Sequence, residues 1–152
     1  MIKTQRKTQK MARSCDPSDL VNVREDARHG CEQIFHHPLA KLFNYTLGVK
    51  LHRDTAQAQW FLDALALSIN HKLINSSALF LQGDKVDVFL NVFEPVDGGY
   101  VATISVTDYE GNRLAFESLG STDHPAGRWS FKMARTMCGG RVVTMLWLPQ
   151  ED

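Results

Sequence analysis

Three residues in the C-terminal part of the sequence have the side chains of a nucleophilic site. Asp123 and His124 lie in a turn-rich segment, and Cys138 follows at the next turn. A thiol activated by an imidazole, which a carboxylate orients, is the arrangement of cysteine nucleophiles. The alternative is that Asp-His-Pro only shapes a turn, because Asp and Pro suit turn geometry. A small Cys/His hydrolase or transferase is therefore one candidate function.

A second set of residues has the chemistry of a metal site. His29, Glu32 and His36 are spaced by three and four residues, so a helix would place them on one face. Imidazole and carboxylate groups on successive turns could hold zinc. The spacing is not that of HExxH, and the alternative is a solvated polar helix face that contains histidines. We expect no cofactor, and the sequence favours a protein that is not an enzyme.

Basic residues gather at two places although the net charge is zero. The first 13 residues hold five of the seventeen Lys and Arg and none of the seventeen Asp and Glu, so this arm carries +5 and the remainder −5. A second cluster lies near the C-terminus. These residues could neutralise phosphates, which makes nucleic-acid binding an alternative function, although the acidic remainder disfavours it. The two groups are Lys3, Arg6, Lys7, Lys10 and Arg13, and Arg128, Lys132, Arg135 and Arg141.

Cysteine usage and hydropathy indicate the compartment. The three cysteines are irregularly spaced and form no CxxC pair, which is typical of reduced thiols rather than of a disulfide framework. No apolar run approaches the roughly 18 residues of a membrane span, and no apolar segment of a secretory signal follows the basic N-terminus. We expect a soluble cytoplasmic protein without a membrane partner.

The composition is that of one globular domain. The chain has 152 residues, of which 43% are hydrophobic and 22% charged, a mix that excludes disordered and collagen-like classes. We expect a disordered basic arm over residues 1–15, a single domain over 16–149 and a short polar tail over 150–152.

Helical periodicity dominates the first half of that domain. Apolar residues at intervals of three and four after the start signal Asp16-Pro17 predict a first helix that stops before Pro38. Pro38 can begin a second helix, which runs to Leu47. A third helix is predicted from Asp54, where a capping box begins, to about Leu73.

The period changes to two after residue 78. Alternating residues predict strands at 79–81, 86–93, 100–107 and 113–119, separated by turn signals. Residues 128–137 fit a strand or a helix, and we favour a strand because it forms a hairpin with 141–148. The fold class is therefore α+β, with about three N-terminal helices on one face of a five- or six-stranded antiparallel meander.

Such an arrangement leaves one face of the sheet without a cover. Alternation along 86–93 places Phe89 and Phe93 on the face opposite to the aliphatic one. Exposed apolar patches usually mark interfaces. The favoured function is a small, non-catalytic binding or regulatory protein that contacts a second copy of itself or another protein through this face.

Overall fold

The fold is α+β, with one mixed seven-stranded sheet. The computed structural model describes residues 13–27, 33–95 and 99–152. The strand order is β1-β2-β7-β6-β3-β4-β5, and every neighbouring pair is antiparallel except β2 and β7, which are parallel. The strands are β1 (Ile34–His36), β2 (Phe43–Thr46), β3 (Val86–Phe93), β4 (Val101–Thr107), β5 (Arg113–Ser121), β6 (Gly127–Cys138) and β7 (Arg141–Trp147).

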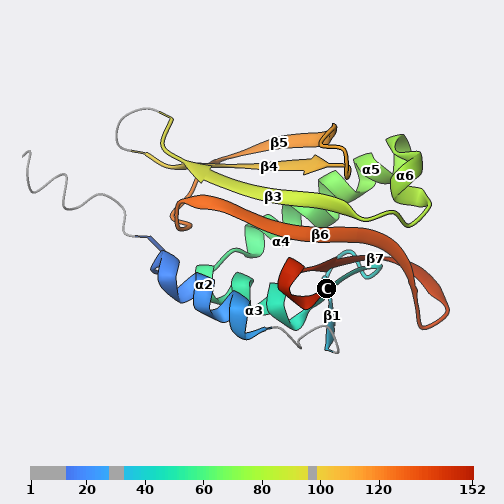
Figure 1. Cartoon of the computed structure of the whole chain (residues 1–152), viewed down its shortest axis with the longest axis horizontal. Coiled ribbons are helices and arrows are strands. Elements are labelled where there is room, and N and C mark those ends of the chain that lie inside the picture. Colours follow the sequence, from blue (N-terminus) through green and yellow to red (C-terminus); the bar gives the residue numbers. More distant parts are fainter. Residues whose placement is uncertain (1–12, 28–32, 96–98) are drawn as a thin grey trace, which may run out of the picture.

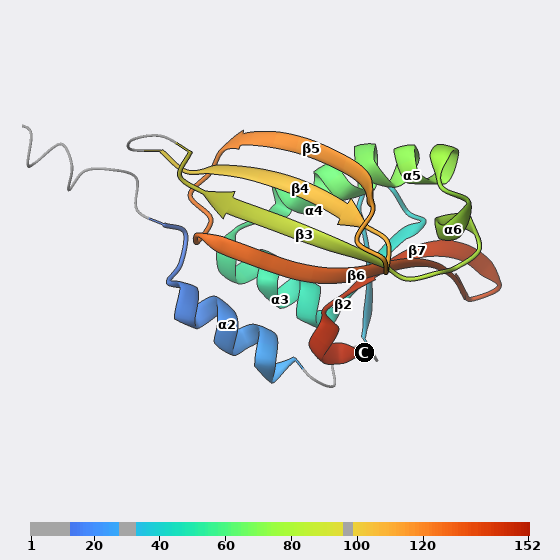
Figure 2. The ribbon, with the colours of Figure 1, turned by 45° about the horizontal axis from the view of Figure 1, so that its top comes forward.

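The helices gather on one side of the central strands. Figures 1 and 2 show α4 and α5 behind β3, β4 and β5, with α2 and α3 beside β6. No helix in the described part of the chain is long and apolar enough to cross a membrane. The helical elements are α2 (Pro17–Asp26), α3 (Leu47–Ala56), α4 (Gln59–Ala64), a π-helical turn (Leu65–Ile69), α5 (Asn70–Ser76), α6 (Ala78–Leu81) and a C-terminal 3-10 turn (Pro149–Glu151).

The hydrophobic core lies between these helices and the inner face of the sheet. Phe61 of α4 packs on Phe131 of β6, with ring centroids 4.7 Å apart. The alternate residues Val86, Val88, Leu90 and Val92 of β3 are all buried. Alternation in β3 therefore places one side of the strand in the core, as the sequence pattern predicts.

The sheet is larger than the sequence predicts and is connected differently. The hairpins β3–β4 and β4–β5 follow the expected meander, but β6 crosses back and pairs with β3 along Val86–Val92 instead of with β5. The segment 128–137, which fits either a strand or a helix in the sequence, lies within strand β6. The prediction of a purely antiparallel sheet with five or six strands is wrong in these details.

The predicted N-terminal helices also differ from those in the structure. The first ends at Asp26, and Ile34–His36 forms strand β1. Where a second helix was expected, Phe43–Thr46 forms β2, and helix α3 begins only at Leu47. All four residues of β2 are buried, so apolar spacing there reflects burial on both faces rather than a helical stripe.

The third predicted helix is split into shorter pieces. The expected capping box at Asp54 lies in the last turn of α3, which ends at Ala56 and is followed by Gln57 with a left-handed φ of 53°. Three helical segments then follow as far as Ser76. Residues 79–81, predicted as a strand, belong to the short helix α6, which Ser77 caps by accepting the N–H of Phe80.

A residue of the predicted C-terminal tail, Glu151, contacts the start of α3. The buried carboxylate of Glu151 accepts hydrogen bonds from Thr46 Oγ1 at 2.6 Å, from Gly48 N at 3.0 Å and from Leu148 N at 2.8 Å. A Cβ on Gly48 would lie 2.6 Å from the Glu151 carboxyl carbon. The N-terminal turn of α3 thus requires a glycine at position 48, because the Glu151 carboxylate occupies the space that a side chain would need.

We predict that Glu151→Ala lowers the free energy of unfolding by about 2–3 kcal/mol, because it leaves three buried donors without an acceptor. Denaturant unfolding measures the change. Gln150→Ala, at the exposed neighbouring position, is the matched control and should change the free energy of unfolding by less than about 0.5 kcal/mol. Equal stability of Glu151→Ala and the wild type would contradict this role.

Candidate functional site

A chain of three polar side chains crosses the core beside β6. Arg24 Nη1 lies 2.8 Å from His52 Nδ1, and His52 Nε2 lies 2.9 Å from His124 Nε2. His124 Nδ1 lies 2.9 Å from the carbonyl oxygen of Pro125. Because a guanidinium only donates and a carbonyl only accepts, one assignment satisfies every contact. Arg24 donates to His52, His52 donates through Nε2 to His124, and His124 donates through Nδ1 to Pro125.

This assignment requires both imidazoles to be neutral, and the electrostatics agree. Burial holds the pKa of His52 well below its usual range, and the charge of Arg24 lowers it further. Burial also lowers the pKa of His124 to about 4. The same cause lowers the pKa of Arg24 to about 10, a change that Glu151 partly opposes. Near pH 7 the chain therefore contains one buried cation and two neutral histidines.

Arg24 also covers an edge of the sheet. Strand β7 pairs with β6 only from Lys132 to Cys138, so none of the described strands lies beside the first part of β6 on that edge. A second nitrogen of Arg24, Nη2, donates to the carbonyl of Ser130 there. The guanidinium lies 4.9 Å from the centre of the Phe131 ring. Helix α2 thus takes the place that a longer β7 would occupy.

These contacts indicate a structural role for His124 rather than a catalytic one. His124 and His52 are 0% and 1% exposed, and all four ring nitrogens are engaged. Trp60 packs edge-on against His124, with ring centroids 6.0 Å apart. Neither imidazole can reach a substrate while the core stays closed.

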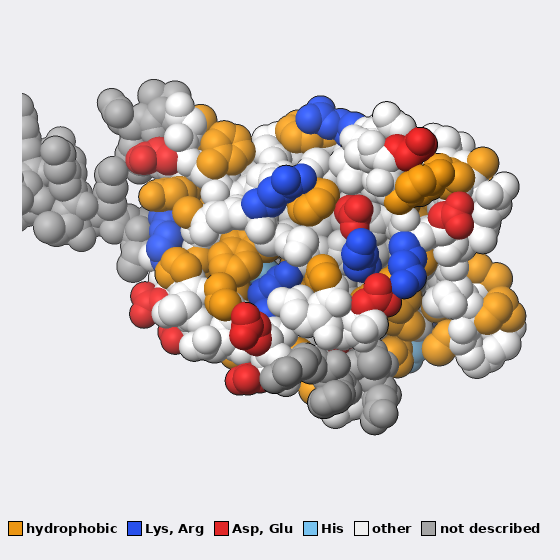
Figure 3. Space-filling model, in the orientation of Figure 1, with side chains coloured by type: hydrophobic (Ala, Val, Ile, Leu, Met, Phe, Trp, Pro, Cys, Tyr) orange, Lys and Arg blue, Asp and Glu red, His pale blue; other side chains and the backbone are white. Residues whose placement is uncertain are grey.

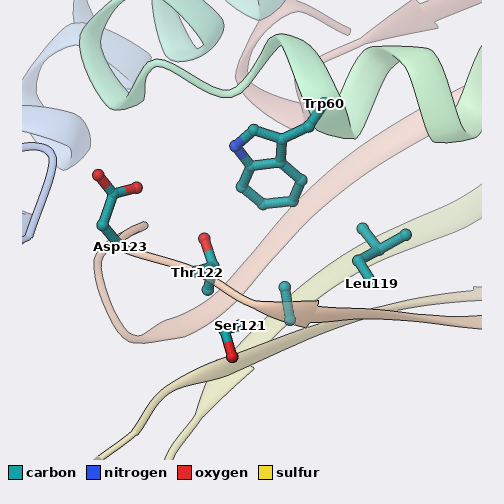
Figure 4. A pocket seen from close by; sticks show the side chains of 6 residues that line it. Trp60, Leu119, Ser121, Thr122 and Asp123 are labelled. Atoms are coloured by element: carbon teal, nitrogen blue, oxygen red, sulfur yellow. The ribbon is translucent and has the colours of Figure 1, made fainter.

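Asp123 faces a cavity instead of orienting His124. The cavity has a volume of about 420 Å³ and is lined by Trp60, Ala102, Leu119, Ser121, Thr122 and Asp123. Figure 4 shows the Asp123 carboxylate and the Trp60 indole on its walls. His124 Nδ1 is bonded to Pro125 rather than to this carboxylate. The two residues are neighbours in the sequence without forming a catalytic pair.

Cys138 lies far from both residues. His124 precedes the start of β6, and Cys138 is the last residue of that twelve-residue strand, which spans roughly 35 Å of extended chain. Cys138 and Cys15 are both free thiols. The structure therefore does not bring Asp123, His124 and Cys138 together, because an uninterrupted strand separates the thiol from the imidazole.

The helical spacing on which the predicted metal site rests does not hold at His36, which lies in a strand. His29 and Glu32 lie outside the described residues, and His36 is in strand β1, where its Nδ1 is 2.7 Å from Asn44 Oδ1. Among the residues that the structure describes, no group of three or more His, Cys, Asp or Glu could hold a metal ion. The helix on which the predicted spacing depends already ends at Asp26.

The basic residues predicted for nucleic-acid binding are divided among several places. Lys3, Arg6, Lys7 and Lys10 lie outside the described residues. Arg13 donates to the carbonyl of Thr122 at 3.0 Å and lies over the Tyr100 ring at 4.3 Å. Arg128 and Lys132 lie on the outer face of β6. Arg135 contacts Thr144 on the opposite face, and Arg141 begins β7.

No helix of the described residues covers the outer side of strands β6, β3, β4 and β5, here called the open face (Figures 1 and 2). Cross-strand register places its residues in three rows. Figure 3 shows Lys and Arg side chains interspersed with hydrophobic ones on this side. The rows are Lys132-Asp87-Thr107-Arg113, Ser130-Phe89-Ser105-Phe116 and Arg128-Asn91-Thr103-Ser118, with Phe93 beyond them on β3.

Arginines stack on the aromatic rings of this face. Arg128 lies 3.8 Å from the centre of the Phe89 ring, and Arg113 lies 4.7 Å from that of Phe116. Phe93 and Phe116 are 44% and 46% exposed, whereas Phe89 is half-buried. Lys132 donates to Asp87 at 2.5 Å. Three cations and one anion give the rows a net charge of +2.

Sequence reasoning found part of this surface. Phe89 and Phe93 follow from the alternation in one strand. Arg113 was not singled out, and Phe116 was considered for base stacking without being placed on the same face, because that placement depends on the pairing of β5 with β4. Arg24 and His52 were missed as well. No local signal marks His52 among six histidines, since its partners come from α2 and from the segment before β6.

We predict that the stability of the protein falls as the pH drops from about 6.5 to 4. The unfolded chain takes up protons at His124 and His52 in this range, whereas the folded state does not, so acid favours unfolding. His124 alone accounts for about 3 kcal/mol of this loss of stability, because its pKa is lowered from the ordinary value of 6.5 to about 4 in the folded protein. Denaturant unfolding at a series of pH values should show this slope.

His124→Gln tests the assignment, because it removes one of the two groups and should make the slope shallower. His71→Gln, at an exposed histidine of α5, should leave the slope unchanged. A slope that is the same in His124→Gln and in the wild type would show that His124 is not the residue responsible.

Comparison with known proteins places the chain in a family. No curated protein and no solved structure matches it. A family model described as "Family of unknown function (DUF6876)" matches residues 25–151. The match covers most of the chain and includes His52, His124 and every strand of the sheet. The chain therefore belongs to the DUF6876 family.

Proposed function

We propose that the chain is a non-catalytic binding protein that uses the open face to contact a macromolecular partner. The observation that carries the proposal is the pair of arginines stacked on Phe89 and Phe116, on a sheet face that none of the described helices covers. The buried histidines and the distant Cys138 support a role without catalysis.

The charge of the open face indicates what kind of partner it can contact. In a symmetric dimer the same patch of both copies meets, so Arg113, Arg128 and Lys132 would face a second set of cations. With a net charge of +2 on each side, that contact is repulsive. A second copy on this face, which the sequence suggests, is therefore disfavoured relative to an anionic partner.

Among anionic partners, single-stranded nucleic acid fits the side chains of this face. Bases stack on exposed aromatic rings and on guanidinium planes, and this face offers both. Between the rings, the hydroxyl of Ser105 and the amide of Asn91 lie within 3.2 Å of each other, and such groups hydrogen-bond to base edges. Arg128 and Lys132 supply the positive charge that phosphates need. Nucleic-acid binding through this face is thus the form of the proposal that we favour.

We expect a fluorescein-labelled oligouridylate to bind at low salt, as fluorescence anisotropy measures. Phe116→Ala should weaken binding by about 5- to 100-fold, because stacking of one base contributes about 1–3 kcal/mol. Arg128→Gln should reduce the slope of the logarithm of affinity against the logarithm of salt concentration by about 0.7. Lys72→Gln is the control, since Lys72 pairs with Glu117 on the helical side of the sheet.

Light scattering on the same samples separates the alternatives. A wild-type dimer that becomes monomeric in Phe116→Glu, together with no binding of the oligonucleotide, would replace nucleic acid by a second copy as the partner. A monomer that binds no oligonucleotide would contradict the nucleic-acid proposal. Equal weakening by Lys72→Gln and Arg128→Gln would show that binding is not localised to the open face.

A further inference from the structure

A second, smaller cavity lies at the other edge of the sheet, away from β5. Its volume is about 360 Å³, and its lining residues are His36, His37, Pro38, Lys41 and Arg141. They come from the end of β1, from the loop before β2 and from the start of β7. Four of these five side chains carry or can accept a positive charge, and none is acidic.

The parallel pairing of β2 and β7 explains why these residues meet. Phe43 is opposite Thr144, and Thr144 N donates to the carbonyl of Leu42 at 2.8 Å. This register brings Lys41, just before β2, to the same end as Arg141, the first residue of β7. His36 joins them because β1 places it opposite Asn44. Positions about 100 residues apart in sequence thus line one cavity.

The described residues leave Lys41 and Arg141, the two permanent cations of this cavity, without an acidic partner. Lys41 and Arg141 are both exposed, and neither side chain makes a hydrogen bond or an ion pair with any residue that the structure describes. Asp63 is the acid connected to this loop, and its carboxylate is held by His37 Nε2 at 2.8 Å and by Gln59. Two unpaired cations at one cavity repel each other, and a bound anion would remove that cost.

The loop that carries Lys41 is fixed in place. His37 is 1% exposed, and its Nδ1 accepts the N–H groups of Leu39 and Ala40, both at 3.1 Å. Its Nε2 therefore carries the proton that is donated to Asp63. At His36, Asn44 Oδ1 accepts from Nδ1 at 2.7 Å. Nε2 of the neutral ring is then an acceptor, which can take the O–H of a protonated phosphate group. A loop held in this way loses little entropy on binding.

We propose that this cavity is a binding site for a phosphate group, held by Lys41, Arg141 and His36. Arginine presents a planar pair of donors that matches phosphate oxygens, and lysine adds a point charge. The site is separate from the open face and does not depend on the function proposed for that face.

Titration with inorganic phosphate, observed through the NMR signals of the His36 ring, tests the site directly. The signals should move in a saturable way, while those of His71 on α5 should not. Lys41→Gln and Arg141→Gln should each weaken phosphate binding by about tenfold, because each removes a charge-assisted contact. Lys50→Gln is the control, since Lys50 pairs with Asp54 on α3.

The comparison of anions defines what the site recognises. Phosphate should bind at least as tightly as sulfate and more tightly than chloride at equal ionic strength. Equal movement of the His36 signals with all three salts would indicate only ionic screening and would overturn the proposal. It would also be overturned if Lys50→Gln weakened binding as much as Arg141→Gln.

Discussion

The pairing of β6 with β3 is the interaction on which the rest of the structure depends. If β6 had continued the meander beside β5, Arg128 would not lie over Phe89, and Lys132 would not meet Asp87. The same pairing places the segment before β6 next to α3 and α4, where His124 contacts His52 and Trp60. One strand thus contributes its outer side to the charged open face, while the segment that leads into it joins the polar chain of the core.

Burial determines the role of the two histidines whose side chains could act in catalysis. His124 and His52 have the side chains of general acids and bases, but each is enclosed by aromatic rings and has both ring nitrogens occupied. A buried polar network of this kind fixes one arrangement of the helices, because breaking any contact leaves a donor or an acceptor without a partner. Arg113 and Arg128, by contrast, are exposed on the open face, where a partner can contact them. Binding is therefore better supported than catalysis.

The sequence predicts the second half of the fold better than the first. Strands β3, β4, β6 and β7 follow from alternation and turn residues, which are local signals. Strands β1 and β2 were missed because they are only three and four residues long, and β2 is stabilised by its distant partner β7. The open face was predicted through Phe89 and Phe93. Its positive charge was not, since Arg113, Arg128 and Lys132 reach it only through the strand order.

The claim that the open face is the contact surface can be tested most directly by mapping a complex residue by residue. Backbone amide NMR signals of the labelled protein, recorded as an unlabelled single-stranded oligonucleotide is added, report which residues meet it. The account predicts that the largest changes occur at Phe89, Ser105, Phe116 and Arg128, in adjacent rows of one sheet face. Changes confined to α2 and α3, or no change at saturating oligonucleotide, would contradict it.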